Sequence, residues 1–596
     1  MKRIVILVLA VALTLTSCLP KGGDVARLIP QDAYAAVVAE SPLDLFKSAD
    51  SFYKAAALSD VEDGKSLMDI LKDFSEKNDM FKEAVECFDF GRPFALAVVP
   101  DTSGKKPRAV VVFWLPMKDG QASYTRLLGS LEDFKGTSAF VKNYAAICLN
   151  GTAPTALPAK RADLSRLSAY PKDSLKAWLN MESLWKDFGD QWVNALEKAT
   201  DEPSAVEEVA PGEPFDYNER NFDWDEYFEE QNPRRGLPGL SEEIPNPREL
   251  LGKIAENVRS LDFSVGVNEK GVHLRVGASV PEDRALGKFV SAAGPAKGLP
   301  YVKYLEADAL MGGVSSLDPS ALSQFMKLYL KAFNMEKYLG EAYFKLLESS
   351  YAAQGPDSAF SFDLSLAPDF MQNAQQARTP DQISDLIRKS ISLDLSGTYA
   401  LRDEDLYRET LKQLSDKDIF GAAFKELMDS AGMEMGIRVE EGETSGVPYD
   451  AVQITLGGPM ISGSPEGKAA LDALMEKLVM YSSCRDGKAY MVMGNPELLP
   501  EAIQRDGAAV PIAQDPKYKD FAATLPKGAR GVYYVSLRKL YEIIAPFAPN
   551  FASVPAESLD KLYGYMAMSK GSMETGLFLG VGDIKSIIGL ASELHL

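Results

Sequence analysis

The sequence predicts an α+β protein built from two related halves, each of antiparallel sheet packed with helices. Three patterns predict this fold: a turn, a short apolar strand and an amphipathic helix in succession; a β-hairpin followed by a helix; and a strand that ends in a turn. Each pattern occurs in both halves of the chain. Their joint recurrence favours an internal duplication, with α+β halves at residues 25–297 and 298–596.

The turn–strand–helix pattern occurs four times, over residues 30–46, 171–185, 308–325 and 526–541. The first and third copies share Asp-Ala before the strand, so we expect Asp32 and Asp308 to occupy equivalent positions. The second and fourth copies share a Pro-Lys start. Asp32 and Asp173 each stand between a proline and a strand, which favours a role in the turn over a catalytic one.

The hairpin pattern is clearest at residues 261–280 and 563–581, where two alternating strands meet at a Lys-Gly tip. In a duplication these two hairpins should superpose. Longer hairpins are predicted at residues 94–115 and 433–456, and the strand with its turn at residues 144–151 and 489–495.

The N-terminus has the three parts of an export signal. Lys2 and Arg3 precede the apolar run Ile4–Leu13, which is too short to span a bilayer as a helix, since that needs roughly 20 residues. The next residues, Leu15-Thr16-Ser17-Cys18, resemble the lipobox of bacterial lipoproteins. The resemblance implies a signal peptide at residues 1–17, lipidation of Cys18 and a tether at residues 18–24. No aspartate follows Cys18, which favours an outer-membrane destination facing the periplasm or the cell surface.

Between residues 197 and 249 the composition changes. Residues 201–232 contain 12 acids and one base, Arg220, with early prolines that break helices. This predicts a disordered, solvated insert in the first half. Its aromatic residues could dock on the protein or on a partner.

Composition excludes several classes of function. The net charge of −21 argues against nucleic acid as a partner, because phosphate binding needs clustered Lys and Arg. The chain has only two histidines, His273 and His595, which argues against zinc sites with histidine ligands and against acid–base catalysis by histidine. His273 is expected on the surface of a strand. After Cys18 three cysteines remain, consistent either with one Cys87–Cys148 disulfide or with three buried thiols.

No motif in the sequence predicts catalytic, cofactor-binding or metal-binding residues, and no cofactor is expected. P-loop, Rossmann, HExxH and CxxC patterns are absent. Two Asp-rich stretches, at residues 216–218 and 223–225, lack the remaining ligands of a calcium loop. Ser-x-x-Lys pairs begin at Ser51, Ser103, Ser183, Ser536 and Ser558, but their partner motifs are missing. Ser183 and Ser536 precede predicted helices, where serine is usually a cap.

The opening of the mature chain also resembles a broad group of bacterial lipoproteins of unknown function. The matching residues run from Leu28 through Pro30, Asp32 and Ala33 to Ser41-Pro42-Leu43, and a strand–turn piece covers residues 486–498. The resemblance implies an α+β protein of the cell envelope and brings no activity or site residues.

We therefore expect a non-enzymatic, membrane-anchored lipoprotein that binds a protein partner or an apolar ligand through its paired halves. One alternative is a periplasmic carrier of lipid or another hydrophobic molecule. A second alternative is a histidine-independent hydrolase, for which the Ser-x-x-Lys pairs are the argument. The charges that can be placed from sequence lie in turns, on outer helix faces and in the insert. This predicts no cluster of buried, perturbed titratable groups around a pocket.

Overall fold

The computed structural model of the chain describes residues 27–55, 86–101, 108–130, 136–164, 166–167, 170–171, 174–201, 252, 255–332, 339–416, 425, 428, 432, 434–458, 464–547 and 559–584. The predicted signal peptide, Cys18, His595 and the acidic stretch at residues 201–232 lie outside these ranges, apart from Asp201 at the end of a helix. Asp173, Ser103 and Ser558 are likewise outside.

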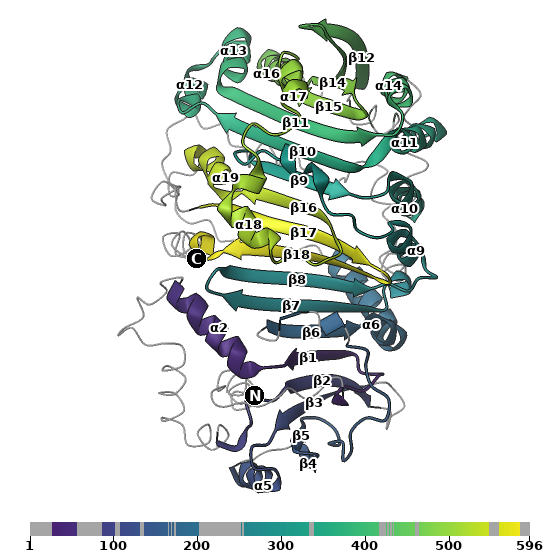
Figure 1. Cartoon of the computed structure of the whole chain (residues 1–596), viewed down its shortest axis with the longest axis vertical. Helices are drawn as coiled ribbons and strands as arrows, with labels where there is room; N and C mark the ends of the chain where they lie inside the picture. Colours follow the sequence, from purple (N-terminus) through teal and green to yellow (C-terminus); the bar gives the residue numbers. More distant parts are fainter. Residues whose placement is uncertain are drawn as a thin grey trace.

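Eighteen strands form one sheet, in which every recorded pairing is antiparallel (Figure 1). The first half contributes β1 Ala35–Ala39, β2 Phe94–Asp101, β3 Arg108–Pro116, β4 Thr137–Val141, β5 Tyr144–Cys148, β6 Ser174–Asn180, β7 Ser260–Asn268 and β8 Gly271–Ser279. The second half contributes β9 Met311–Ser316, β10 Gln354–Leu366, β11 Ile391–Leu401, β12 Glu434–Thr444, β13 Val447–Gly457, β14 Met480–Arg485, β15 Lys488–Met493, β16 Ala529–Ser536, β17 Lys561–Ser569 and β18 Ser572–Gly580. The α+β prediction is confirmed.

The two halves have the same strand order. The pairings of the first half run β4-β5-β3-β2-β1-β6-β7-β8. Those of the second run β14-β15-β11-β10-β9-β16-β17-β18, and β13 and β12 extend the outer edge. The last strands of the halves, β8 and β18, pair with each other and make the sheet continuous.

Each copy of the repeated unit is a strand that leads into a helix, as the sequence predicts. The pairs are β1 with α2 Pro42–Ala55, β6 with α6 Met181–Asp201, β9 with α10 Pro319–Ala332 and β16 with α19 Leu537–Ile544. Side chains at the strand ends cap two of these helices: Asn180 accepts from the Ser183 amide at 3.1 Å, and Ser536 accepts from the Lys539 amide at 3.3 Å.

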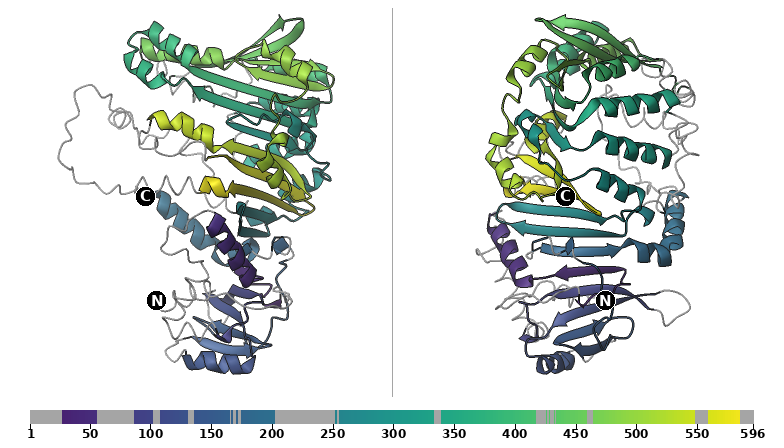
Figure 2. Two further views of the ribbon diagram at one scale, coloured as in Figure 1. Left: turned by 60° about the vertical axis from the view of Figure 1, so that its left-hand side comes forward. Right: turned by 45° about the vertical axis from the view of Figure 1, so that its right-hand side comes forward.

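Further helices line the strand ends on both long sides of the sheet or, like α18 Pro516–Ala522, lie over the strands themselves (Figures 1 and 2). The others are α5 Gln121–Ser130, α9 Ala285–Ala292, α11 Glu341–Ala353, α12 Phe370–Gln376, α13 Pro380–Ser390, α14 Glu404–Gln413, α16 Pro465–Lys477 and α17 Leu498–Arg505, with short 3-10 turns at Pro300–Tyr304, Ile512–Gln514 and Ala545–Phe547. In Figure 1, α9, α10 and α11 follow one side, while α2, α19 and α12 follow the other.

The strand registers relate the halves residue by residue. Asp262 in β7 and Tyr563 in β17 stand at the same distance from the two-residue turns of their hairpins, so residues 260–279 correspond to residues 561–580. In the first half β7 pairs with β6 and β6 with β1, and in the second half β17 pairs with β16 and β16 with β9. The registers of these pairs place Met311 at the position that Ala35 has in the first half. Asp308 is therefore the counterpart of Asp32, as the shared Asp-Ala predicts.

The core lies on both sides of the sheet. One side, which we call the covered face, carries the two largest clusters, around Trp178 in the first half and around Tyr563 in the second. The opposite side, the open face, carries smaller clusters near Phe94 and near Phe289. Cys148 belongs to the covered face and Cys87 to the open one, so no disulfide joins them, and Cys87, Cys148 and Cys484 are free thiols.

Candidate functional site

The open face is apolar across the centre of the sheet. Along β6, β7, β8 and β18, the side chains of Leu175, Val265, Leu274 and Leu577 lie directly opposite one another in register. Between 36% and 43% of each residue remains accessible to solvent. Large apolar side chains in the middle of a sheet are normally covered, so this row marks an unusual surface.

The apolar surface extends beyond these four strands. On β1, β6, β7, β8, β18 and β17 every open-face residue is apolar or glycine, except Thr575. Further exposed members follow on the outer strands: Val37 on β1, Tyr533 on β16, Met311 on β9 and Phe360 on β10. We call these exposed residues, together with the central row, the apolar strip.

Two glycines let aromatic rings lie along the open face. A Cβ atom on Gly564 would stand 2.1 Å from the ring of Tyr533, and one on Gly313 would stand 2.8 Å from the ring of Phe360. Each glycine lies directly opposite its aromatic residue on the neighbouring strand. The rings therefore cover the neighbouring backbone and extend the apolar strip.

Among the described residues, helices border the apolar strip without covering its centre. Phe289 of α9 and Ala321 of α10 pack with Ala278 and Met568 at one end of the strands. On the other side α2 contacts β7, and its Phe46 packs with Phe94. In the right-hand view of Figure 2 the teal helices α9 to α11 form a separate row beside the sheet.

The covered face of the same strands is charged. Lys176 on β6 and Asp262 on β7 are completely buried. Lys176 donates to Glu40 at 3.0 Å and to the carbonyl oxygens of Leu167 and Tyr170 at 2.7 and 3.0 Å. Both charges are thus paired and hydrogen-bonded, as burial requires.

Asp262 is the centre of a second set of contacts. The Arg166 Nε atom donates to Asp262 Oδ1 at 2.7 Å, and the Tyr170 hydroxyl donates to Oδ2. Arg166 also donates to the carbonyl oxygen of Met573 at 3.2 Å and lies 3.8 Å from the carboxylate of Glu574, both in the second half. We call Arg166, Tyr170, Asp262 and Glu574 the Asp262 cluster.

Gly277 makes room for this cluster. A Cβ atom there would stand 2.2 Å from Arg166 Nη2 and 2.3 Å from Asp262 Oδ2. Burial, followed by the hydrogen bond to Asp262, raises the pKa of Tyr170 far above its ordinary range. Burial lowers the pKa of Arg166, but the hydrogen bond and charge of Asp262 outweigh this effect and raise it.

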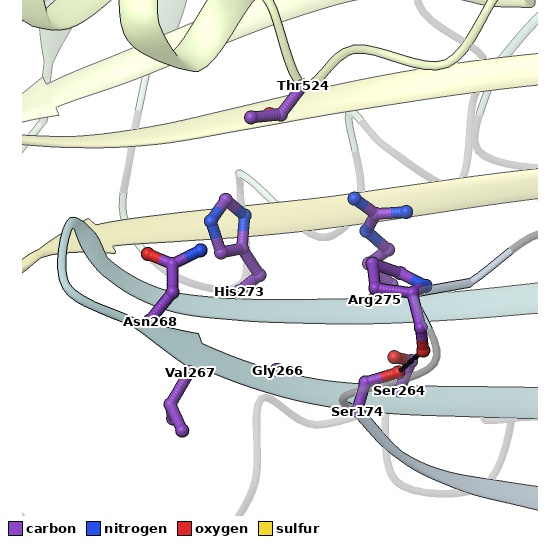
Figure 3. Close-up of a pocket in the computed structure, with 9 residues that line it drawn as sticks. Ser174, Ser264, Gly266, Val267, Asn268, His273, Arg275 and Thr524 are labelled. Atoms are coloured by element: carbon purple, nitrogen blue, oxygen red, sulfur yellow. Dashed lines mark hydrogen bonds between the residues drawn. The ribbon is translucent and has the colours of Figure 1, made fainter. Parts of the chain in front are cut away.

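Two cavities lie on the covered face, and Arg166 and Asp262 of the cluster line the larger one. The smaller, about 270 Å³, is lined by Ser174, Ser264, His273, Arg275 and Thr524 (Figure 3). In Figure 3 His273 and Arg275 rise from one strand toward Thr524, which lies above them. His273 is half-buried, with its ring 4.6 Å from that of Phe578. It is a strand residue, as the sequence predicts, but it faces a cavity instead of bulk solvent.

The larger cavity has a volume of about 560 Å³. Its wall includes Arg161, Arg166, Trp178, Arg259 and Lys570. We call it the arginine cavity. These residues come from the segment before β6, from β6 itself, from the start of β7 and from the β17–β18 turn.

The buried charges overturn one sequence-based expectation. Charged groups are not confined to turns and outer helix faces, because Lys176 and Asp262 point inward from strands and two residues of the perturbed Asp262 cluster line the larger cavity. The residues 174–180 and 260–268 do alternate between polar and apolar. That alternation shows that the two faces of each strand differ, but the polar face of an antiparallel sheet usually lies in solvent, so the pattern alone does not reveal that these charges are buried.

Of the two serines expected to cap helices, Ser183 lies inside α6, where Asn180 accepts the capping hydrogen bond, so that prediction is wrong. Ser536 caps α19, and Lys539 binds both oxygens of Asp363 at 2.6 Å. Lys54 pairs with Asp50 at 2.7 Å. Among the described residues no group of three or more His, Cys, Asp or Glu side chains is arranged to hold a metal ion. None of the described helices is both long and apolar enough to cross a membrane.

Comparisons with protein-family models, with curated proteins and with solved structures gave no significant match to this chain.

Proposed function

We propose that this chain is a lipid-anchored protein of the bacterial cell envelope, and that it binds an apolar ligand with hydrocarbon chains on the apolar strip. It acts by binding and not by catalysis. The observation that carries the proposal is the row Leu175, Val265, Leu274 and Leu577, exposed on adjacent strands where the two halves join. Exposed apolar area of this kind usually marks a binding surface.

The chemistry of the strip favours hydrocarbon over a protein surface. Its central strands present no charged side chain on the open face, and their backbone groups are paired within the sheet. Protein interfaces normally carry about one hydrogen bond per 100–200 Å², and this surface offers very few side-chain donors or acceptors. A hydrocarbon chain needs none.

The apolar strip is also long enough to hold a lipid hydrocarbon chain. From Val37 on β1 to Phe360 on β10 the strip crosses nine neighbouring strands. At about 4.8 Å per strand this is roughly 38 Å, longer than the roughly 15 Å depth of one bilayer leaflet's hydrocarbon. Lipid on Cys18 would keep the strip close to a membrane, the source of such ligands.

Two other functions fit less well. A protein partner fits less well because the strip offers few side-chain donors or acceptors for the hydrogen bonds of a protein interface. If a partner did dock there, the purified protein would carry no lipid on the strip. A histidine-independent hydrolase rests on Ser-x-x-Lys pairs, and Ser536 with Lys539 is engaged in capping and in binding Asp363. A carrier of lipid between membranes is a form of the proposed activity.

The test measures binding of pyrene-labelled phosphatidylglycerol presented in vesicles. Leu274→Glu and Leu577→Glu each place a charge in the central row, which should weaken binding about tenfold or more because hydrocarbon cannot solvate a carboxylate. Ile454→Glu is the matched control, since Ile454 lies on β13 and is 41% exposed. Equal binding by all variants would contradict the proposal.

Purification of the native protein from membranes gives an independent readout. Mass spectrometry should find lipid bound in near-stoichiometric amount to the wild type and much less to Leu274→Glu. Lipid-free protein that carries a stoichiometric protein partner would decide for the partner alternative.

A further inference from the structure

The arginine cavity is a second surface of interest, and it lies on the opposite face from the apolar strip. It combines four cationic side chains, Arg161, Arg166, Arg259 and Lys570, in a chain whose net charge is −21. Its wall also carries three carboxylates, Asp163, Glu182 and Asp262, and the last is paired with Arg166. A concentration of positive charge in so acidic a chain calls for a physical reason.

In the second half, aromatic residues occupy the strand positions that Asp262, Ser264 and Gly277 hold beside the arginine cavity. The counterparts of Trp178, Asp262, Ser264 and Gly277 are Tyr534, Tyr563, Tyr565 and Phe578. Phe521 fills the space above them, with its ring 5.1 Å from that of Tyr563 and 6.3 Å from that of Phe578.

The same strand positions therefore make a packed aromatic core in one half, and a charged cluster beside the arginine cavity in the other. An aromatic core is the simpler way to stabilise these strands, because a buried ion pair gains little over apolar packing. We conclude that the polar residues of the first half serve a purpose other than stability.

Several donors around the arginine cavity are unused. Arg161 and Arg259 are exposed and form no ion pair within the described part of the chain. The indole N–H of Trp178 has no acceptor there, although the residue is 94% buried, with 6% of its surface accessible. An unmatched buried donor costs free energy and indicates a missing acceptor.

The second half contains a charged cluster of its own, and it differs in being satisfied. Asp506 accepts from Lys303 at 2.8 Å, from Lys488 at 2.7 Å and from Tyr304 and Tyr490. Burial raises the pKa of Asp506, but these four hydrogen bonds outweigh it and hold the pKa well below its usual value. In that cluster the lysines and tyrosines converge on one carboxylate of the protein itself, whereas Arg161 and Arg259 of the arginine cavity have no such carboxylate among the described residues.

We propose that the arginine cavity binds a small polar molecule through an oxyanion, either phosphate or carboxylate, held between Arg161 and Arg259. Guanidinium groups match both anions with paired, charge-assisted hydrogen bonds. A volume of about 560 Å³ is within the usual range of small-ligand sites. The site is independent of the apolar strip, because the strands of the sheet separate the two surfaces.

Isothermal titration calorimetry of the full chain at low ionic strength tests the proposal, with inorganic phosphate and citrate as probes. The wild type should bind at least one probe, and the comparison of the two separates phosphate from carboxylate recognition. Arg161→Gln with Arg259→Gln should weaken binding by about tenfold or more, since charged hydrogen bonds are lost. Arg378→Gln, at an exposed arginine remote in sequence from the cavity, should leave affinity unchanged.

Two further variants keep the result interpretable. Arg161→Lys with Arg259→Lys should retain part of the affinity, because charge remains while the paired geometry is lost. Ser279→Tyr should block binding by filling the cavity while all four cations stay in place. Wild-type protein that binds neither probe at about 10 mM, or a double glutamine variant of wild-type affinity and melting temperature, would overturn the proposal.

Discussion

The guanidinium of Arg166 lies 2.7 Å from the carboxylate of Asp262, and the strand registers give Asp262 the position that Tyr563 occupies in the second half. One position of a repeated hairpin thus holds a buried ion pair in one copy and a stacked aromatic ring in the other. The first two predictions follow from this difference.

Arg166→Met should lower the free energy of unfolding by about 3 kcal/mol, because it leaves the Asp262 carboxylate buried without its cation. Arg166→Met with Asp262→Asn should recover part of that loss. Urea denaturation measures both. Arg388→Met, which removes an exposed pair with Glu476, should have a much smaller effect, because water screens exposed ion pairs. A loss for Arg166→Met no larger than this control would show that the buried pair matters little.

Gly277→Ala should destabilise the protein by about 2 kcal/mol, because the new Cβ atom would overlap Arg166 and Asp262 and the cluster would have to move. Gly129 in α5 provides the control, since nothing lies within 4 Å of the position that a Cβ atom would take there. Gly129→Ala should be neutral or slightly stabilising, as alanine favours helices. Equal melting temperatures for the two variants would argue against a packed cluster around Gly277.

Asp583 predicts a pH dependence of stability. Burial, aided by the nearby charge of Asp560, raises the pKa of Asp583 to about 6 in the folded protein, against about 3.9 in an unfolded chain. The folded state therefore binds more protons between these values, and its stability falls as the pH rises from about 4 to 6.

Asp583→Asn should remove this loss. The free energy of unfolding should rise by about 2 kcal/mol at pH 7–8 and hardly change at pH 4. Thermal melts across this range measure the effect. Asp385→Asn is the control: hydrogen bonding to Lys389 lowers the pKa of Asp385, so its removal should bring no gain at neutral pH. A gain for Asp583→Asn that does not change with pH would exclude the proton-linked cause.

Cys18→Ser should leave the protein unprocessed or free of the membrane, because the acyl chains on Cys18 supply the anchor. Membrane fractionation and labelling with radioactive palmitate measure the two effects. Palmitate label still found on the serine variant would place the lipid on another residue.

Local pattern by itself determined much of the fold. Proline and Asp-Ala turns, alternating strands and amphipathic helices depend on neighbouring residues, so the four strand–helix units and the paired hairpins are visible in the sequence. The equivalence of Asp32 and Asp308 is an example, since it follows from the short motif that precedes each strand.

Tertiary structure alone decided which side of each strand is covered. Alternation in β6 and β7 shows that their two faces differ, but the residues that cover one face come from distant segments. Arg166 stands 96 residues before Asp262, and Glu574 comes from the other half. The pairing of β8 with β18 is equally remote in sequence, and it creates both the apolar strip and the cluster beneath it. Such contacts depend on how the halves meet, and no local sequence pattern encodes that geometry.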